Sequence, residues 1–366
     1  MDLTLDTLIQ SNYVRILISS LVSMAITIKS IPLIIKFGDH KNLMDNPIKQ
    51  RSSHFVPIPT FGGVALFTGT MIGYHLWNYG EEGLLLHKMI VGFVVLFFLG
   101  LKDDILVLDP IKKVLSQIIA AALVVIGSDL RLDNFFGIFG IYEVSYLVSI
   151  TFTIFFFLVI INAFNLIDGI DGLSAGIGMI NTFFLGLWFL VNSHWSLAAF
   201  ALCLSLSLLG FLFFNFSKTQ KIFMGDTGSL IIGYVITILS IKFIHLNSSH
   251  SFRIDTFVSA PILVLVSLSI PLFDFLRVLI IRIITRRPPW KGDRLHLHHI
   301  LIDLGLSHIQ ASFVLYVVTI GITTFTYYLR SFFSNTQLML LIAAYFVLYL
   351  FICQTLEKKR VKLLKL

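Results

Sequence analysis

The chain has 366 residues, of which 57% are hydrophobic and only 13% charged, and its mean hydropathy is +0.90. Soluble domains carry about 25% charged residues, so this composition excludes an ordinary soluble protein. It favours a single polytopic membrane domain over residues 1–366. The formal net charge of +7 follows from membrane topology, and no nucleic-acid partner is needed to explain it.

The hydropathy profile predicts an all-α integral membrane protein. A helix that crosses a hydrocarbon core of about 30 Å needs roughly 20 apolar residues, and about eleven segments approach this length. The fourth segment is short, and no linker or break in composition divides the chain. The predicted transmembrane helices are Tyr13–Ile35, Phe61–Trp77, Leu84–Leu101, Val114–Gly127, Val144–Ile161, Leu173–Val191, Trp195–Phe216, Ser229–Leu246, Phe257–Ile284, Phe313–Leu329 and Leu338–Leu356.

The Lys and Arg residues predict the orientation of these spans, because short cytoplasmic loops are rich in both. Most of them follow odd-numbered spans, and a basic tail ends the chain. The loops on the other side hold only Arg15, Lys88, Arg131, Arg253 and Arg330. We therefore expect the amino terminus outside and the carboxyl terminus in the cytoplasm.

The first polar cluster is the adjacent pair Asp103 and Asp104, where the third span ends. Two carboxylates at a membrane interface are costly unless a cation or a proton neutralises them. Two interpretations stay open. The pair is either a solvated loop feature balanced by nearby lysines such as Lys112 and Lys113, or part of a site.

The second cluster runs from Asn162 to Gly172 and is the most specific pattern in the chain. Spacings of three place Asn162, Asn165 and Asp168 on one helical face. The Asp-Gly steps at Asp168 and Asp171 then break the helix into turns that can present carboxylates and backbone amides to a ligand. A simple polar cap between two spans would explain one Asp-Gly step, but not four spaced polar groups.

The third cluster is Gly225-Asp226-Thr227-Gly228-Ser229, which opens a span. Asp226 can cap this helix, or it can hold a cation, since Mg²⁺ is usually bound by one or two carboxylates plus substrate phosphates. One or both of the first two acids would complete such a site. Asn215, at the end of the preceding span, is a further candidate polar contact.

The fourth cluster contains Arg294, His296, His298 and His299 in a loop that also carries other cations. Such a loop is suited to neutralising a diphosphate. A positive-inside anchor would explain the Arg and Lys residues, but not the three His residues. Inside the ninth span, Asp274 and Arg277 lie three apart, which predicts a structural ion pair, with a role beside the site as the alternative.

All four clusters are predicted to lie on one membrane face, because two crossings separate each cluster from the next. Carboxylates, a cation and a basic loop on one face favour phosphoryl or phosphoglycosyl transfer, which depends on charge neutralisation and positioning. The two cysteines, Cys203 and Cys353, lie inside spans without metal-ligand or redox spacing, so we expect them to be packing residues.

These motifs, in this order, resemble the polyprenyl-phosphate N-acetylhexosamine-1-phosphate transferases, relatives of the phospho-N-acetylmuramoyl-pentapeptide transferase. The resemblance covers nearly the whole chain and implies an Mg²⁺-dependent enzyme. It implies Asp103, Asp104, Asp168 and Asp171 as catalytic residues, with the first two near the lipid phosphate and one of them a candidate to deprotonate it, and Asp226 as the metal ligand. Substrate contacts are implied for Asn162, Asn165, Asn215, Phe223, Arg294, His296, His298 and His299, and for His54 in the first cytoplasmic loop.

The hypothesis is therefore transfer of N-acetylhexosamine 1-phosphate, with N-acetylglucosamine as first choice, from a UDP-sugar to undecaprenyl phosphate. The reaction would release UMP at the cytoplasmic membrane of a bacterium, as the first membrane step of a cell-surface polysaccharide. A homodimer is possible, and the oligomeric state is left open. The alternative is a secondary transporter with an acid-lined pathway, which would place its acids near the middle of the membrane.

Overall fold

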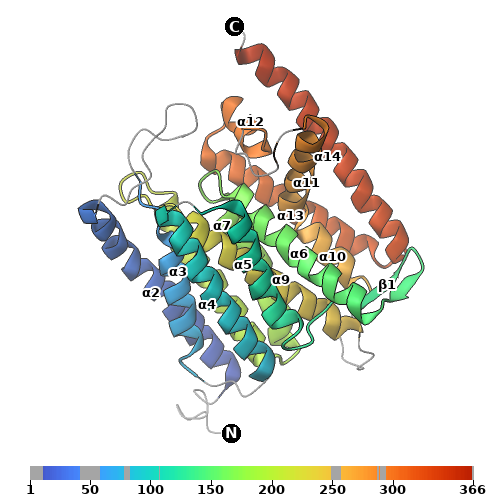
Figure 1. The fold of residues 1–366 in the computed structure, drawn as a ribbon, viewed down its shortest axis with the longest axis horizontal. Helices are drawn as coiled ribbons and strands as arrows, with labels where there is room; N and C mark the ends of the chain where they lie inside the picture. Colours follow the sequence, from blue (N-terminus) through green and yellow to red (C-terminus); the bar gives the residue numbers. More distant parts are fainter. Residues whose placement is uncertain are drawn as a thin grey trace.

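The computed structural model describes residues 11–41, 58–77, 83–106, 108–248, 257–286, 288 and 294–364. Its helices lie side by side in one bundle, and a two-stranded antiparallel hairpin lies at the end away from α12 (Figure 1). The elements are α2 (Asn12–Lys41), α3 (Gly62–Tyr74), α4 (Gly83–Leu106), α5 (Pro110–Val125), β1 (Asn134–Ile138), β2 (Ile141–Glu143), α6 (Tyr146–Ile167), α7 (Leu173–Val191), α8 (Trp195–Asn215), α9 (Gly225–Ser248), α10 (Ala260–Ser267), α11 (Ser269–Ile284), α12 (Leu297–Asp303), α13 (His308–Leu329) and α14 (Asn335–Leu364).

The helices agree with an all-α membrane protein apart from the small hairpin. Within the described ranges, eight helices are long and apolar enough to cross a membrane, and α10 with α11 forms a bent ninth candidate. The helices α3 and α5 have 13 and 16 residues and are too short to count with these eight. Every predicted span coincides with a helix or with the bent pair, so the all-α fold is confirmed, whereas the number of crossings and the orientation of the termini stay predictions.

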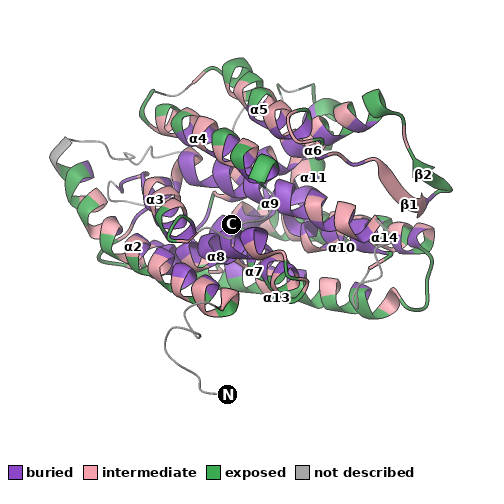
Figure 2. Cartoon of the chain, turned by 90° about the horizontal axis from the view of Figure 1, so that it is seen from below, coloured by how far each residue is buried: buried purple, intermediate pink, exposed green. Residues whose placement is uncertain are grey.

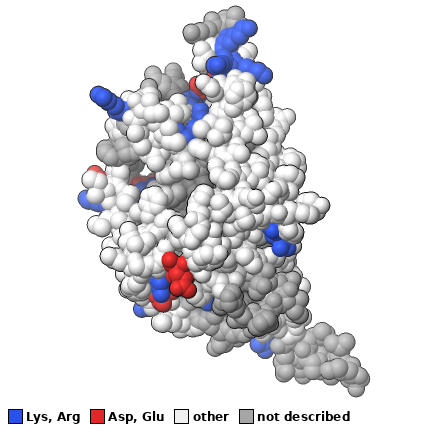
Figure 3. All heavy atoms as spheres, turned by 90° about the vertical axis from the view of Figure 1, so that its right-hand side faces the viewer, with Lys and Arg blue, Asp and Glu red and all other residues white. Residues whose placement is uncertain are grey.

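The helices α8 and α9 form the centre of the bundle. In their most apolar 18 residues, 78% and 83% are buried, compared with 22% in α14 and 28% in α2. Figure 2 shows the same contrast between a buried centre and exposed outer helices. The face in Figure 3 is mostly uncharged, and Lys and Arg gather around the carboxyl end of α14. An uncharged outer surface of this kind is what a lipid environment requires.

A close approach of α4 to α9 brings two of the polar clusters together. A Cβ atom on Gly100 would lie 2.4 Å from the Cα of Thr227, so no larger residue fits between these helices. Because Gly100 stands one turn before Asp103 and Asp104 on α4, this contact places both acids beside Asp226.

The ninth predicted span, Phe257–Ile284, corresponds to the pair α10 and α11 and not to one straight helix. It is bent by 69° between α10 and α11. Pro271 has no N–H to donate to the carbonyl of Ser267, so the helical ladder is interrupted at this turn. The side chain of Asn181 from α7 donates to that carbonyl instead, at 3.3 Å. The bend is thus stabilised by a partner on another helix, and it sets the direction of α11.

Candidate active site

Asp104 at the end of α4 acts as a cap for the start of α9. Its Oδ1 accepts a hydrogen bond from the backbone N–H of Asp226 at 2.7 Å, and its Oδ2 accepts from the N–H and the hydroxyl of Thr227 at 3.1 and 2.6 Å. A carboxylate in this position satisfies unpaired N–H groups and interacts favourably with the helix dipole. Gly225 has a φ of +73°, and a Cβ there would lie 2.6 Å from Asp104 Oδ2. Asp104 therefore fixes where Asp226 lies.

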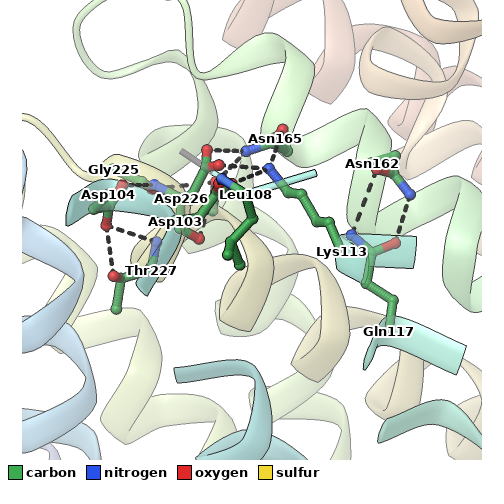
Figure 4. Close-up of polar contacts among 11 residues, drawn as sticks. Asp103, Asp104, Leu108, Lys113, Gln117, Asn162, Asn165, Gly225, Asp226 and Thr227 are labelled. Carbon is green, nitrogen blue, oxygen red and sulfur yellow. Dashed lines mark hydrogen bonds and ion pairs between the residues drawn. The ribbon is translucent and has the colours of Figure 1, made fainter. Parts of the chain in front are cut away.

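Asp103, Lys113, Asn165 and Asp226 form what we call the acid cluster (Figure 4). The ammonium of Lys113 lies 2.9 Å from Asp103 Oδ2 and 2.5 Å from Asp226 Oδ2. The amide of Asn165 donates to Asp226 Oδ1 at 2.6 Å, and the N–H of Leu108 donates to Asp103 Oδ1 at 2.6 Å. Helices α4, α5, α6 and α9 thus each contribute one side chain to one charged centre.

The oxygens of the acid cluster fit a magnesium ion. Three of them, from Asp103, Asp226 and Asn165, surround the Lys113 ammonium, the Asn165 oxygen at 3.5 Å. Among the described residues no three His, Cys, Asp or Glu side chains form a metal cage. Mg²⁺ does not need one, because it is commonly held by one or two carboxylates together with substrate phosphates and water. The donor set is therefore suited to a metal that arrives with a phosphate ligand.

Asn162 does not belong to the acid cluster, although it shares a helical face with Asn165. Its amide donates to Gln117 of α5 at 2.8 Å and to the Leu158 carbonyl at 2.8 Å. Figure 4 shows Asn162 and Gln117 set apart from the acids. This pair aligns α5 with α6, and so supports the position of Lys113, which also lies on α5.

Asp171 lies in a second charged group, formed by the turn between α6 and α7. Its Oδ2 is 2.6 Å from the ammonium of Lys221 and 2.9 Å from Nδ1 of His308. Burial would raise the pKa of Asp171, but the hydrogen bonds from His308 and Lys221 outweigh it, and the pKa is lowered. Asp171 Oδ1 is buried without a hydrogen-bond partner. The side chain is thus held ionised, with one oxygen unused.

Asp168 lies three residues before Asp171 and has the opposite electrostatic character. Desolvation, followed by the charges of Asp226, Asp104 and Asp171, raises its pKa well above the usual value. No cation pairs with it among the described residues. The two Asp-Gly steps therefore carry one acid with a lowered pKa and one with a raised pKa.

The segment from Arg294 to Asp303, which we call the histidine segment, contacts the turn that contains Asp168. A Cβ on Gly169 would lie 2.3 Å from His298 Nε2, and this nitrogen is buried without a hydrogen-bond partner. Burial, with the charge of His299 next, lowers the pKa of His298 well below its usual value. Burial and the charge of Arg294 lower the pKa of His299 to about 4. Both rings are therefore neutral at physiological pH.

The predicted ion pair between Asp274 and Arg277 is not present in the described part of the chain. Asp274 Oδ2 instead lies 2.6 Å from His296 Nδ1, and Oδ1 accepts the N–H of Leu297 at 2.9 Å. Arg277 donates to the Leu295 carbonyl at 2.6 Å. The prediction failed because the bend in the ninth span directs both side chains to the histidine segment, and not to each other.

Asn215 and Phe223 lie beside this region. The Oδ1 of Asn215 accepts the N–H of Gly172 at 2.6 Å, and its amide donates to the Ile222 carbonyl at 2.8 Å. The Lys221 ammonium lies 5.5 Å from the centre of the Phe223 ring. Asn215 thus joins the α6–α7 turn to the segment before α9, and its contact with a substrate stays a prediction.

Residues from all four predicted clusters meet at one end of the bundle, as the spacing of the clusters predicts. His54 lies outside the described residues, and Arg294 pairs with Asp303 at 2.7 Å. Sequence reasoning missed the roles of Gln117, Lys221 and His308, which lie outside the polar motifs. It considered Lys113 only as a counter-charge in a loop, although a lysine shortly after two acids was a usable signal.

Comparison with known proteins adds independent information. The model of glycosyl transferase family 4 matches residues 86–244. A Bacillus subtilis protein named "probable undecaprenyl-phosphate N-acetylglucosaminyl 1-phosphate transferase" is 31% identical over 85% of this chain and 84% of its own length. An undecaprenyl-phosphate alpha-N-acetylglucosaminyl 1-phosphate transferase of Salmonella typhimurium is 31% identical over 79% of this chain and 75% of its own length. A decaprenyl-phosphate N-acetylglucosaminephosphotransferase of Mycobacterium leprae is 30% identical over 76% of this chain and 74% of its own length. The chain therefore belongs to glycosyl transferase family 4, as the resemblance of its motifs predicts.

Proposed function

We propose that this protein transfers N-acetylglucosamine 1-phosphate from UDP-N-acetylglucosamine to undecaprenyl phosphate and releases UMP. The observation that carries the proposal is the acid cluster, which gathers two carboxylates and one ammonium at the end of an apolar bundle. The names of the relatives support the same reaction and acceptor. Acids at one end of the bundle, and relatives that are transferases, leave the transporter alternative without support.

The reaction joins an oxygen of the lipid phosphate to the β-phosphorus of the UDP-sugar. The bond between that phosphorus and the bridging oxygen breaks, and UMP leaves with the electron pair. A phosphate monoester has a second pKa of about 6, so the acceptor is mostly a dianion at neutral pH. The protein therefore needs to bring together two highly charged groups more than it needs a strong base.

Asp103 is better placed than Asp104 to act on the acceptor phosphate. Both oxygens of Asp104 are engaged in capping α9. Asp103 uses one oxygen for the Leu108 N–H and the other for Lys113. Movement of the flexible lysine side chain would release that second oxygen for a proton or an acceptor. We assign Asp103 to contact with the acceptor and Asp104 to positioning.

Asp226, with Asp103 and the Asn165 oxygen, would hold Mg²⁺. The ion would supply charge neutralisation for the diphosphate when bound. Lys113 pairs with the same carboxylates and would have to yield these oxygens to the ion. Lys221 and Arg294 extend the positive potential towards the nucleotide. The sugar specificity rests on the names of the relatives, because no described contact identifies the sugar.

The test is transfer of label from a panel of radiolabelled UDP-sugars into lipid, using membranes that contain the protein, undecaprenyl phosphate and Mg²⁺. We expect transfer from UDP-N-acetylglucosamine, with UMP released, and loss of transfer in Asp226→Asn at normal protein levels. No transfer from any UDP-sugar by intact protein would refute the function. Near-normal turnover by Asp226→Asn would refute the metal assignment alone.

A further inference from the structure

Asp274 is a buried carboxylate in the membrane half-helix α11 that the proposed reaction does not use. It is 2% exposed, and its partner His296 is 4% exposed. Besides the contacts with His296 and the Leu297 N–H, its Oδ1 accepts the hydroxyl of Tyr349 from α14 at 2.9 Å. A buried carboxylate is expensive unless it is well hydrogen-bonded. This one has three partners, and two of them belong to the histidine segment.

A second connection joins α14 to the same segment closer to the carboxyl end of α14. Arg360 lies 2.8 Å from Asp303 Oδ2 and donates to the Arg294 carbonyl at 3.2 Å. Arg294 completes the group by pairing with Asp303 Oδ1 at 2.7 Å. The segment from Arg294 to Asp303 is thus held from the last helix at both of its ends.

We propose that Asp274 is a positioning residue that fixes the orientation and tautomer of His296, and that α14 supports the histidine segment through Tyr349 and Arg360. The inference rests on the proposed function, in which Arg294 of this segment extends the positive potential towards the nucleotide. It adds that the buried face of α14, far from the acid cluster in sequence, belongs to the donor-binding apparatus.

The tautomer follows from the chemistry of the contact. A carboxylate only accepts hydrogen bonds, so the Nδ1 of His296 carries the proton that points at Asp274. Carboxylates behind a functional imidazole act in this way, fixing the ring and leaving the other nitrogen for the ligand. The orientation of His298 is coupled to that of His296, because the two rings are parallel within 9° at a centroid distance of 5.5 Å. Rotation of His296 would therefore also disturb the ring that covers the Asp168 turn.

Asp274→Asn tests the proposal, because the amide keeps the shape and can still accept from Leu297 and Tyr349. Its NH₂ group would face His296 and impose the opposite tautomer. We expect kcat to fall about 10–100-fold, the usual effect of removing a supporting carboxylate. The KM for undecaprenyl phosphate should not change. In a His296→Asn background, Asp274→Asn should cause no further loss.

Arg360→Gln tests the second connection, with Lys359→Gln as a matched control of equal charge at an exposed neighbour. We expect Arg360→Gln to lower kcat and Lys359→Gln to leave it unchanged. If Asp274→Asn does not reach the membrane, the comparison of Arg360→Gln with Lys359→Gln and the variant Tyr349→Phe still test whether α14 supports the histidine segment.

Amount and thermal unfolding of each detergent-purified variant are measured alongside activity. Loss of folded protein with an unchanged kcat per folded molecule would mean a purely structural role. Multiplying losses in the Asp274→Asn and His296→Asn double variant would also overturn the proposal, because the two residues would then act independently. An inactive wild-type protein would instead refute the proposed function.

Discussion

At the scale of single residues, Lys113 decides the charge balance of the acid cluster. Its ammonium lies between Asp103 and Asp226, the two carboxylates that we propose as ligands of Mg²⁺. Lysine and metal should therefore compete for the same oxygens. We expect Lys113→Gln to lower the Mg²⁺ concentration for half-maximal activity by on the order of tenfold, equivalent to about 1.4 kcal/mol, measured by titration of the transfer assay.

Lys112→Gln is the control for this titration. It removes the same charge from the neighbouring position, where the side chain is exposed. Its Mg²⁺ dependence should match that of the wild type. A higher Mg²⁺ requirement in Lys113→Gln would show that the lysine assists metal binding and does not compete with it.

Replacing Asp168 or Asp171 with the neutral Asn is expected to change the stability of the protein in opposite directions. The folded pKa of Asp171 is lowered, so its ionised form stabilises the protein above its unfolded pKa of about 3.9, and this contribution is lost as the pH falls through the folded value. The folded pKa of Asp168 is raised, so its ionisation costs stability as the pH rises from about 3.9. At pH 7, Asp171→Asn should lower the unfolding temperature of the detergent-purified protein and Asp168→Asn should raise it.

The effect of Asp168→Asn should shrink at pH 4, close to the unfolded pKa of about 3.9, whereas the effect of Asp171→Asn should largely persist there, because the folded pKa of Asp171 is lower still. Each variant is compared with the wild type at the same pH, so the titration of other groups cancels. Shifts of the same sign for both variants would contradict the assigned environments.

At the scale of helices and strands, the sequence was informative where one segment determines its own structure. Long apolar runs predicted the spans. Counting the crossings between the polar clusters predicted that the clusters meet at one end of the bundle. Cys203 and Cys353 are buried and unpaired, as their position inside spans predicts. The bend between α10 and α11 could not be predicted in this way. It depends on Asn181, which lies 86 residues away and donates to the carbonyl that Pro271 leaves without a partner.

The same limit applies to the candidate site. The acids were found because motifs concentrate them within a few residues. His308 was missed because it opens α13 in an ordinary-looking segment and reaches Asp171 across 137 residues. The pairing of Asp274 was mistaken because helical spacing predicts Arg277 as its partner, whereas the bend offers His296. Local spacing identifies charged groups, and only packing selects their partners.

At the scale of the whole molecule, the site lies at one end of an apolar bundle, and the direction of that bundle decides which substrates reach it. UDP-sugars are cytoplasmic, and the distribution of Lys and Arg predicts this end inside the cell. Thr219 is exposed in the loop before α9, near Lys221 of the site, whereas Tyr142 is 65% exposed on the hairpin at the opposite end.

Cysteines placed at these two positions can be labelled with a membrane-impermeant maleimide, since both native cysteines are buried. We expect labelling of Tyr142→Cys in intact cells, and labelling of Thr219→Cys only after the membrane is opened. The reverse pattern would place the acid cluster outside, where no UDP-sugar is available, and would contradict the proposed function together with the orientation. Equal labelling of Thr219→Cys from both sides would indicate an alternating pathway and return the transporter alternative to consideration.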